Sequence, residues 1–257
     1  MNATVSATSS KKLAGKVAIV TGGSRGMGAA IAKRLAADGA EVAFSYLSSP
    51  ERAQAVVREL EAAGVRAAAF QADQGAAAQV AKFVKTVIAQ FGRLDILVNN
   101  AGVLVVGPVS DSAEDAAKFD RQFAVNVGGV AAAVRAASGV LSDGGRIINI
   151  GSSTGGRSPW PGIADYSATK AAVAAYTRGW ARDFGPKGIT VNLVQPGHVD
   201  TEMNPAGSAM AQNERNFTAL GRYGRAEEIA AVVAFLAGPD ASYITGATLN
   251  VDGGYNA

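Results

Sequence analysis

Short apolar runs alternate with longer helical patterns along almost the whole chain, and this alternation restricts the fold more than any other feature. The apolar runs predict strands at Val17–Val20, Glu41–Tyr46, Val65–Gln71, Leu94–Val98, Arg146–Ile150, Thr190–Val194 and Ala247–Val251. The segments between them predict helices at Gly26–Asp38, Pro50–Ala63, Ala76–Phe91, within Ala113–Leu141, and at Ala164–Phe184 and Ala226–Leu236. Strands that are nearly all apolar are buried between two helix layers, as in parallel sheets. We therefore expect an α/β fold, a doubly wound seven-stranded parallel sheet in a three-layer α/β/α sandwich.

The composition limits both the class of protein and its chemistry. With 48% hydrophobic and 18% charged residues among 257, the chain suits one globular domain. A net charge of +3 is too small and too scattered to predict a nucleic-acid partner. The absence of cysteine excludes disulfides, thiolate zinc sites and cysteine nucleophiles, and a single histidine, His198, excludes a multi-histidine metal site. We expect chemistry that uses other side chains and no metal.

Three segments define the expected organisation of the domain. Residues 1–12 are polar and predict a disordered tail ahead of one catalytic domain over residues 13–257. The longest apolar run, Ile229–Ala237, falls short of the roughly 18 residues that cross a membrane. The 198–224 segment is long for a connection between a strand and a helix, so it predicts a substrate lid. We expect a cytoplasmic protein with no membrane partner, a compartment that the lack of cysteine suits.

A glycine-rich turn follows the first predicted strand and opens the first predicted helix. It reads Thr21-Gly22-Gly23-Ser24-Arg25-Gly26-Met27-Gly28. Glycines at these positions allow a tight turn and a close approach of the backbone to a pyrophosphate. The helix N-terminus adds free N–H groups and a positive dipole. The turn therefore predicts a phosphate-binding site, although its spacing is G-x-x-x-G-x-G rather than G-x-G-x-x-G.

Further motifs occur in a characteristic order downstream. They are Asn99-Asn100-Ala101-Gly102, Tyr166-Ser167-Ala168-Thr169-Lys170, Pro196-Gly197, Tyr243-Ile244-Thr245-Gly246 and Val251-Asp252-Gly253-Gly254. Together with the glycine turn, they make residues 13–256 resemble the short-chain dehydrogenase/reductases, and the 3-oxoacyl-carrier-protein reductase branch in particular. The resemblance implies a Rossmann-type fold, a nicotinamide cofactor and a small-molecule carbonyl substrate.

The end of the second predicted strand bears on the choice of cofactor. An NAD site usually has a carboxylate there, whereas this chain has Phe44-Ser45-Tyr46-Leu47. Arg25 could pair with a 2′-phosphate, and Ser45 and Ser48 could donate to it, so we predict NADP(H); a solvated Arg25 is the alternative. By resemblance, Asp73 would meet the adenine and Thr201 the carboxamide. The predicted cofactor-binding residues are Gly22, Ser24, Arg25, Gly26, Met27, Gly28, Ser45, Tyr46, Ser48, Asp73, Asn99, Ala101, Gly102, Tyr166, Lys170, Pro196, Gly197, Val199 and Thr201.

Tyr166 and Lys170 lie four apart in one predicted helix, so they project from one face. An ammonium near a tyrosine favours the phenolate, which makes Tyr166 a candidate general acid for ketone reduction. By resemblance, Ser153, thirteen residues upstream, orients the substrate carbonyl in preference to Ser152; an ordinary turn serine is the alternative. Asn126 lies within an apolar helical pattern, where a polar residue must find partners. By resemblance it would hold a water linked to Lys170; a satisfied structural residue is the alternative.

The substrate pocket is the least readable part of the sequence. Its candidates are Ser153, Trp160, Ile163, His198, Met203 and Met210, although His198 and the methionines could equally be structural. We expect an NADPH-dependent reduction of a 3-oxoacyl thioester or a related prochiral ketone to a secondary alcohol. The alternatives are an alcohol, polyol or steroid-type dehydrogenase working oxidatively, and an NADP(H)-binding sensor without turnover. By resemblance we expect a homotetramer formed through the helices at Ala164–Phe184 and within Ala113–Leu141, with small residues at Ala168, Ala172 and Ala175.

Overall fold

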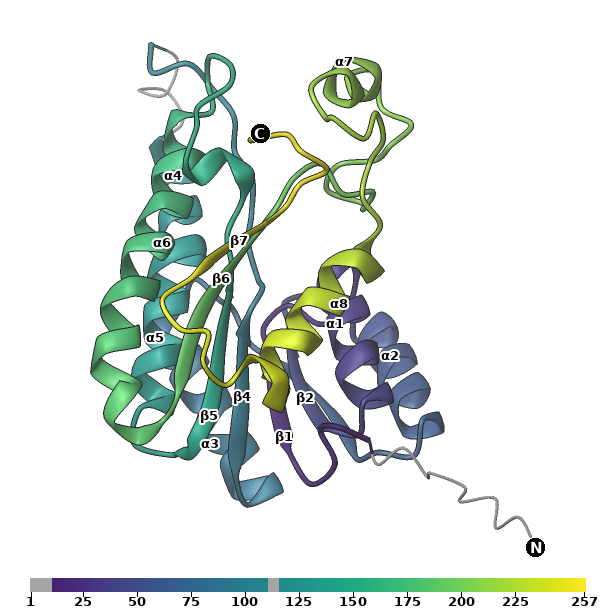
Figure 1. The fold of residues 1–257 in the computed structure, drawn as a ribbon, viewed down its shortest axis with the longest axis vertical. Helices are drawn as coiled ribbons and strands as arrows, with labels where there is room; N and C mark the ends of the chain where they lie inside the picture. Colours follow the sequence, from purple (N-terminus) through teal and green to yellow (C-terminus); the bar gives the residue numbers. More distant parts are fainter. Residues whose placement is uncertain (1–10, 111–115) are drawn as a thin grey trace, which may run out of the picture.

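The computed structural model describes residues 11–110 and 116–257, and a parallel sheet runs through its centre (Figure 1). The sheet is seven-stranded, with the order β3-β2-β1-β4-β5-β6-β7 and parallel pairing throughout. The strands are β1 (Val17–Val20), β2 (Glu41–Tyr46), β3 (Ala67–Gln71), β4 (Leu94–Asn99), β5 (Leu141–Ile150), β6 (Thr190–Pro196) and β7 (Thr248–Val251). The predicted doubly wound sheet is therefore confirmed.

Helices cover both faces of the sheet and complete the three layers (Figure 1). One layer holds α1 (Gly26–Ala37), α2 (Pro50–Ala62) and α8 (Ala226–Ala237), and the other holds α3 (Ala77–Phe91), α5 (Gly129–Ala137) and α6 (Ala164–Phe184). Successive strand residues point to opposite faces, so each strand feeds two separate cores. Val20 and Phe44 belong to the cluster under α1 and α8, whereas Ile19 and Ala43 belong to the cluster under α3 and α5.

The region predicted as one helix within Ala113–Leu141 is divided. Its described part consists of α4 (Ala116–Phe123), a π-helical turn at Ala124–Gly128, and α5; residues 111–115 lie outside the described residues. Strand β5 begins at Leu141 rather than at the predicted Arg146. The residues of β5 before Arg146 do not form an apolar run, so the sequence does not indicate them as strand. In the structure they pair with β4, with an irregularity between Leu94 and Ile96.

The two ends of the predicted domain differ in how much the structure describes. Residues 1–10 of the predicted tail lie outside the described residues, while Lys11 donates to the Ala63 carbonyl and Lys12 pairs with Asp240. No helix among the described residues is both long enough and apolar enough to span a membrane. The 198–224 segment extends beyond the carboxyl ends of the strands and contains the short helix α7 (Ala211–Asn216) (Figure 1).

The strand order places β1 beside β4 at the centre of the sheet. The chain leaves β1 toward β2 on one side, and it leaves β4 toward β5 on the other side. In open α/β sheets such a reversal opens a crevice at the carboxyl ends of the two strands, where ligands bind. The glycine turn follows β1, so the fold brings the predicted phosphate-binding turn to this crevice.

Candidate active site

The glycine turn has the backbone conformation that its sequence predicts. Gly22 and Gly26 have φ values of +69° and +52°, a region that favours glycine. At Gly28, a Cβ atom would lie 2.1 Å from the carbonyl oxygen of Gly22, so no side chain fits without moving the turn. Helix α1 begins at Gly26, and its first turn contains no acidic residue. Its unpaired N–H groups therefore face the crevice with no acidic side chain to oppose an anion.

Asn100 fastens this turn to β4. Its side-chain amide donates to the carbonyl oxygens of Thr21 (2.9 Å) and Gly22 (3.2 Å). The Thr21 hydroxyl in turn accepts from the backbone N–H groups of Asn100 and Ala101, both at 3.0 Å. Sequence analysis named Asn99 instead, and the structure corrects this: the Asn99 amide is buried and donates to Asn149. Neighbouring residues at a strand end point in opposite directions, which the motif alone does not resolve.

A cavity of about 440 Å³ lies over the glycine turn. The predicted cofactor-binding residues that line it are Gly22, Ser24, Arg25, Gly26, Met27, Gly28, Ser45, Tyr46, Asp73, Ala101, Gly102 and Thr201. The other predicted cofactor-binding residues, Ser48, Asn99, Tyr166, Lys170, Pro196, Gly197 and Val199, are not among its lining residues. Val199 is buried in the hydrophobic core, and Gly197 packs against the backbone of Asp252, where a Cβ would approach Cα to 2.7 Å. The glycine cradle, the helix N-terminus and the cavity fit a dinucleotide.

One end of the cavity carries an ion pair that the sequence does not reveal. Asp73 accepts from Arg121 at 2.5 Å and from the Gly75 N–H at 2.8 Å. The bond from Arg121 is the main cause that holds the pKa of Asp73 below its ordinary value. Asp73 is therefore a carboxylate with acceptor capacity left for an adenine amino group. Arg121 comes from α4, and nothing in the local sequence links it to Asp73.

Ser45 and Arg25, the predicted 2′-phosphate ligands, already have partners. The Ser45 hydroxyl lies beneath the turn and accepts from the Gly22 N–H at 3.1 Å. Its position supports the turn, and its contact with a 2′-phosphate stays a prediction because Ser45 also lines the cavity. Arg25 donates to Glu202 at 3.0 Å and is exposed at the cavity rim. Ser48 is exposed in the loop after β2.

Tyr166 and Lys170 project from one face of α6, as predicted, and the Lys170 Nζ lies 5.6 Å from the centre of the Tyr166 ring. Lys170 also donates to the carbonyl of Ile150 at 3.0 Å. Burial raises the pKa of Tyr166 to about 12 and lowers the pKa of Lys170 to about 8. The expected lowering of the Tyr166 pKa by the ammonium is therefore wrong for the protein alone, because loss of water outweighs the distant charge.

The structure places Ser152, rather than the predicted Ser153, against Tyr166. The Ser152 side chain hydrogen-bonds the Tyr166 side chain, which acts to lower the pKa of Tyr166 against the effect of burial. Ser153 starts a short 3₁₀ turn, is buried, and accepts from Asn256 through its backbone carbonyl. The Ser152 hydroxyl also contacts the Thr154 hydroxyl at 2.9 Å and accepts from the Thr154 N–H at 3.2 Å. The predicted role of Ser153 in orienting a carbonyl stays a prediction, and Ser152 becomes the second candidate for it.

Asn126 lies in the π-helical turn, where both ends of its amide are occupied. It accepts from the Val103 N–H and donates to the Val103 carbonyl, both at 2.9 Å, and it donates to Thr169 at 3.2 Å. A Cβ on Gly102 would lie 3.4 Å from Asn126 Oδ1 and 3.5 Å from Lys170 Nζ. Because Gly102 also lines the cavity, the Asn126–Lys170 pair adjoins the cofactor cavity through this glycine.

The predicted substrate residues differ in their burial and in their neighbours. Ile163 is buried at the start of α6, Met210 is exposed beside α7, and Met203 lies at the rim of the dinucleotide cavity. Trp160 stacks with His198, their ring centres 6.3 Å apart. The role of these side chains in substrate binding stays a prediction.

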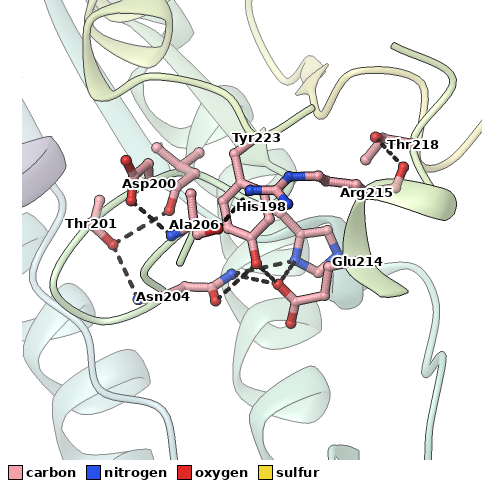
Figure 2. Close-up of polar contacts among 10 residues, drawn as sticks. His198, Asp200, Thr201, Asn204, Ala206, Glu214, Arg215, Thr218 and Tyr223 are labelled. Carbon is pink, nitrogen blue, oxygen red and sulfur yellow. Dashed lines mark hydrogen bonds and ion pairs between the residues drawn. The ribbon is translucent and has the colours of Figure 1, made fainter. Parts of the chain in front are cut away.

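His198 belongs to a polar cluster at the base of the 198–224 segment (Figure 2). Its Nδ1 lies 3.2 Å from Glu214, which also accepts from the Tyr223 hydroxyl and from Asn204. Burial lowers the pKa of His198, and Glu214 opposes this effect. The cluster ties α7 to the chain just after β6. No group of His, Asp or Glu among the described residues could hold a metal ion.

Comparisons with known proteins agree with this geometry. A family model described as "Enoyl-(Acyl carrier protein) reductase" matches residues 22–256. The chain is 43% identical over 244 residues to the Escherichia coli "Cyclic-di-GMP-binding biofilm dispersal mediator protein", covering 95% of this chain and 98% of that one. It is 42% identical over 248 residues to a Synechocystis 3-oxoacyl-[acyl-carrier-protein] reductase (94% and 97% covered). The chain is a short-chain dehydrogenase/reductase.

Further relatives and solved structures extend the comparison to ligands. A probable tetrahydroxynaphthalene reductase of Zymoseptoria tritici is 40% identical over 255 residues, covering 94% of this chain and 95% of that one. A metagenomic blue fluorescent protein in complex with NADPH has a TM-score of 0.93 at 49% identity, covering 96% and 100%. A Burkholderia cenocepacia short-chain dehydrogenase in complex with NADP has a TM-score of 0.93 at 51% identity, with the same coverage. Both of these solved structures hold NADPH or NADP, and their likeness covers the glycine turn and the cavity of this chain.

Replacement of Gly28 by alanine should weaken NADP⁺ binding by about tenfold or more, because the methyl group forces the Gly22 carbonyl and the turn apart. Titration calorimetry measures the dissociation constant. Gly139→Ala is the matched control, since a Cβ there meets no atom within 4 Å. Equal affinity of the Gly28→Ala variant and the control would contradict the assignment of the turn.

Proposed function

We propose that this short-chain dehydrogenase/reductase is a ketoreductase that uses NADPH to convert a ketone into a secondary alcohol. The grouping of Tyr166 and Lys170 on one face of α6, with the Lys170 Nζ 5.6 Å from the Tyr166 ring centre and the Ser152 side chain against Tyr166, carries the proposal. Lys170 lies on the same helix face, and Gly102 connects this group to the dinucleotide cavity. The geometry gives a proton donor and an orienting hydroxyl beside the cofactor site.

The roles of the side chains follow from their positions. When bound, NADPH supplies a hydride from its nicotinamide ring to the carbonyl carbon. Ser152 donates a hydrogen bond that holds the carbonyl oxygen, and Tyr166 transfers its phenolic proton to that oxygen as negative charge develops. The carbon gains the hydride, the oxygen gains the proton, and the C=O bond becomes a secondary alcohol. Lys170, kept in place by Ile150 and adjoining Asn126, favours the phenolate that Tyr166 leaves behind.

The protonated form of Tyr166 is the form that ketone reduction uses as an acid. A Tyr166 pKa of about 12 leaves the hydroxyl protonated at neutral pH, ready to act as an acid. A dehydrogenase that runs oxidatively needs the phenolate as a base, which burial disfavours in the protein alone. The missing carboxylate at the end of β2 and the presence of Arg25 support NADPH over NADH, the cofactor that usually drives reductions.

The named relatives indicate the substrate class. One relative is named a 3-oxoacyl-[acyl-carrier-protein] reductase, and another is named a probable tetrahydroxynaphthalene reductase. Both names denote reductases, and a prochiral ketone fits the Ser152–Tyr166 pair. We propose a 3-oxoacyl thioester or a related ketone as the substrate. The test is NADPH consumption with acetoacetyl thioesters, β-keto esters, aryl ketones and cyclic diketones, each repeated with NADH.

Removing the acid or the orienting hydroxyl should abolish most turnover without loss of cofactor. We expect Tyr166→Phe to lower kcat by roughly 10²–10⁴-fold, the usual contribution of a positioned general acid. Ser152→Ala should lower kcat by about 10²-fold, whereas Ser153→Ala should stay within a few fold of the wild type. Steady-state kinetics on the best ketone of the panel provides the comparison, with NADP⁺ affinity as the test of an intact fold.

Two outcomes of this comparison would refute the assignment. A near-normal kcat in Tyr166→Phe would exclude Tyr166 as the general acid. A larger loss of kcat in Ser153→Ala than in Ser152→Ala would identify Ser153, the serine predicted from spacing, as the orienting residue. Tyr176→Phe is the matched control for the tyrosine, because Tyr176 lies on the same helix and stacks on Trp180.

The rate of reduction should fall at alkaline pH. Burial lowers the pKa of Lys170 to about 8, so its ammonium is present below that pH and is lost above it. Tyr166, with a pKa of about 12, stays protonated over the same range. We expect kcat/KM for ketone reduction to be level below pH 8 and to decline as pH rises through about 8. A profile that stays level to pH 10 would show that the Lys170 charge is not needed.

A second candidate is a binding protein that holds NADP(H) and a regulatory ligand without turnover. The Escherichia coli relative is named for cyclic-di-GMP binding, which favours this alternative. The intact Ser152, Tyr166 and Lys170 group argues against it, because binding alone does not require a proton donor. Absence of turnover across the whole ketone panel, together with tight NADPH binding, would favour the binding protein.

We also propose a homotetramer. Of the predicted small residues on α6, Ala168 and Ala175 are exposed and Ala172 is half-buried. The exposed Ala171 joins them, and Phe123 on the adjacent α4 is 53% exposed. Small residues allow helices of two copies to approach closely. Light scattering should give four times the chain mass of 26.0 kDa, and Ala175→Arg should give a smaller species. A wild-type monomer would refute the proposal.

A further inference from the structure

Glu202 joins two arginines that are distant in the sequence. Its carboxylate accepts from Arg25 at 3.0 Å and from Arg52 at 2.9 Å through each of its oxygens. Arg25 belongs to the glycine turn, Arg52 to the first turns of α2, and Glu202 to the 198–224 segment. The two bonds hold the pKa of Glu202 below its ordinary value, so the carboxylate stays charged. One anion thus connects three separate parts of the chain.

This Arg25–Glu202–Arg52 clamp lies at the cavity rim. Arg25 and Glu202 both line the dinucleotide cavity, together with Tyr46 and Leu47 from the end of β2. In doubly wound folds the end of the second strand is where the adenosine ribose binds and where an arginine accommodates a 2′-phosphate. Each arginine donates through a single nitrogen, so the two guanidinium groups together surround one anion, and a phosphate carries the same sign of charge.

We propose that Arg25 and Arg52 together form the 2′-phosphate subsite of the cofactor, and that Glu202 occupies it as an internal competitor until NADP(H) displaces it. The inference rests on the proposed NADPH preference and adds Arg52 and Glu202 as residues that set it. Sequence analysis named Arg25, Ser45 and Ser48 for the 2′-phosphate. It missed Arg52 and Glu202 because neither belongs to a recognised motif.

The competition ties cofactor choice to the 198–224 segment. A cofactor without the 2′-phosphate has no group to replace the Glu202 carboxylate, so it leaves the clamp in place. A phosphorylated cofactor shifts the equilibrium toward the open clamp by its difference in affinity for the two states. Thr201, next to Glu202, lies 3.7 Å from where a Gly26 Cβ would be, so the released segment borders the pyrophosphate turn. Displacement therefore acts at the base of the predicted lid.

The test compares two probes that differ only in the phosphate. Calorimetry measures dissociation constants of 2′,5′-ADP and 5′-AMP for the wild type, Glu202→Gln, Arg52→Ala and the double variant. Removing the competing charge should tighten 2′,5′-ADP binding about three- to fivefold, the scale of exposed ion pairs, and leave 5′-AMP unchanged. Arg52→Ala should weaken 2′,5′-ADP about tenfold and reduce the gain from Glu202→Gln in the double variant. Both effects should shrink as salt is raised.

Controls and outcomes separate the clamp from general electrostatics. Glu227→Gln and Arg58→Ala make the same charge changes at exposed positions outside the clamp and should leave both probes within twofold of the wild type. If Glu202→Gln tightens both probes equally, or changes neither, Glu202 does not compete with the 2′-phosphate. If Arg52→Ala leaves the affinity for 2′,5′-ADP unchanged, Arg52 is not part of the 2′-phosphate subsite. If the wild type binds both probes equally, the NADPH preference itself fails, whatever the variants do.

Discussion

Asn100 holds the carboxyl end of β4 to the turn after β1, and the site is built on this junction. Its amide donates to Thr21 and Gly22 while Thr21 accepts from the chain that follows β4. The junction fixes the glycine turn on one side and carries Gly102 toward Lys170 on the other. Because β1 and β4 are where the sheet reverses its winding, these four hydrogen bonds join the two strand ends that border the crevice.

Burial, rather than attraction between charges, dominates the electrostatics of the Tyr166–Lys170 pair. Loss of water raises the tyrosine pKa to about 12 and lowers the lysine pKa to about 8. Each shift favours a neutral group, so the pair resists ionisation until charge develops on the substrate oxygen. A buried acid in this state gives up its proton to a developing alkoxide, and the oriented Ser152 hydroxyl stabilises the same charge. The environment therefore suits a reductase.

The sequence determined the architecture and the motif-bearing turns, because strongly periodic segments and strand–turn–helix contexts are local signals. Helix Ala164–Phe184 has the predicted bounds, and the glycine turn lines the cavity as expected. Local sequence patterns do not indicate which way a side chain points or which residues meet through long-range contacts. Spacing selected Ser153, whereas the irregular path after β5 turns Ser152 toward Tyr166. Glu202 reaches Arg25 only through the tertiary fold, so no window of sequence indicates their pairing.

The central claim is a direct transfer of hydride to a carbonyl carbon beside Tyr166, and the fate of an isotopic label tests it most directly. The enzyme would reduce its best ketone with NADPH that carries deuterium at both positions of nicotinamide C4, and the alcohol would be analysed by NMR. The account predicts one deuterium on the carbinol carbon and none elsewhere. Deuterium on a carbon adjacent to an intact carbonyl, as reduction of a C=C bond would give, or an unlabelled alcohol would contradict it.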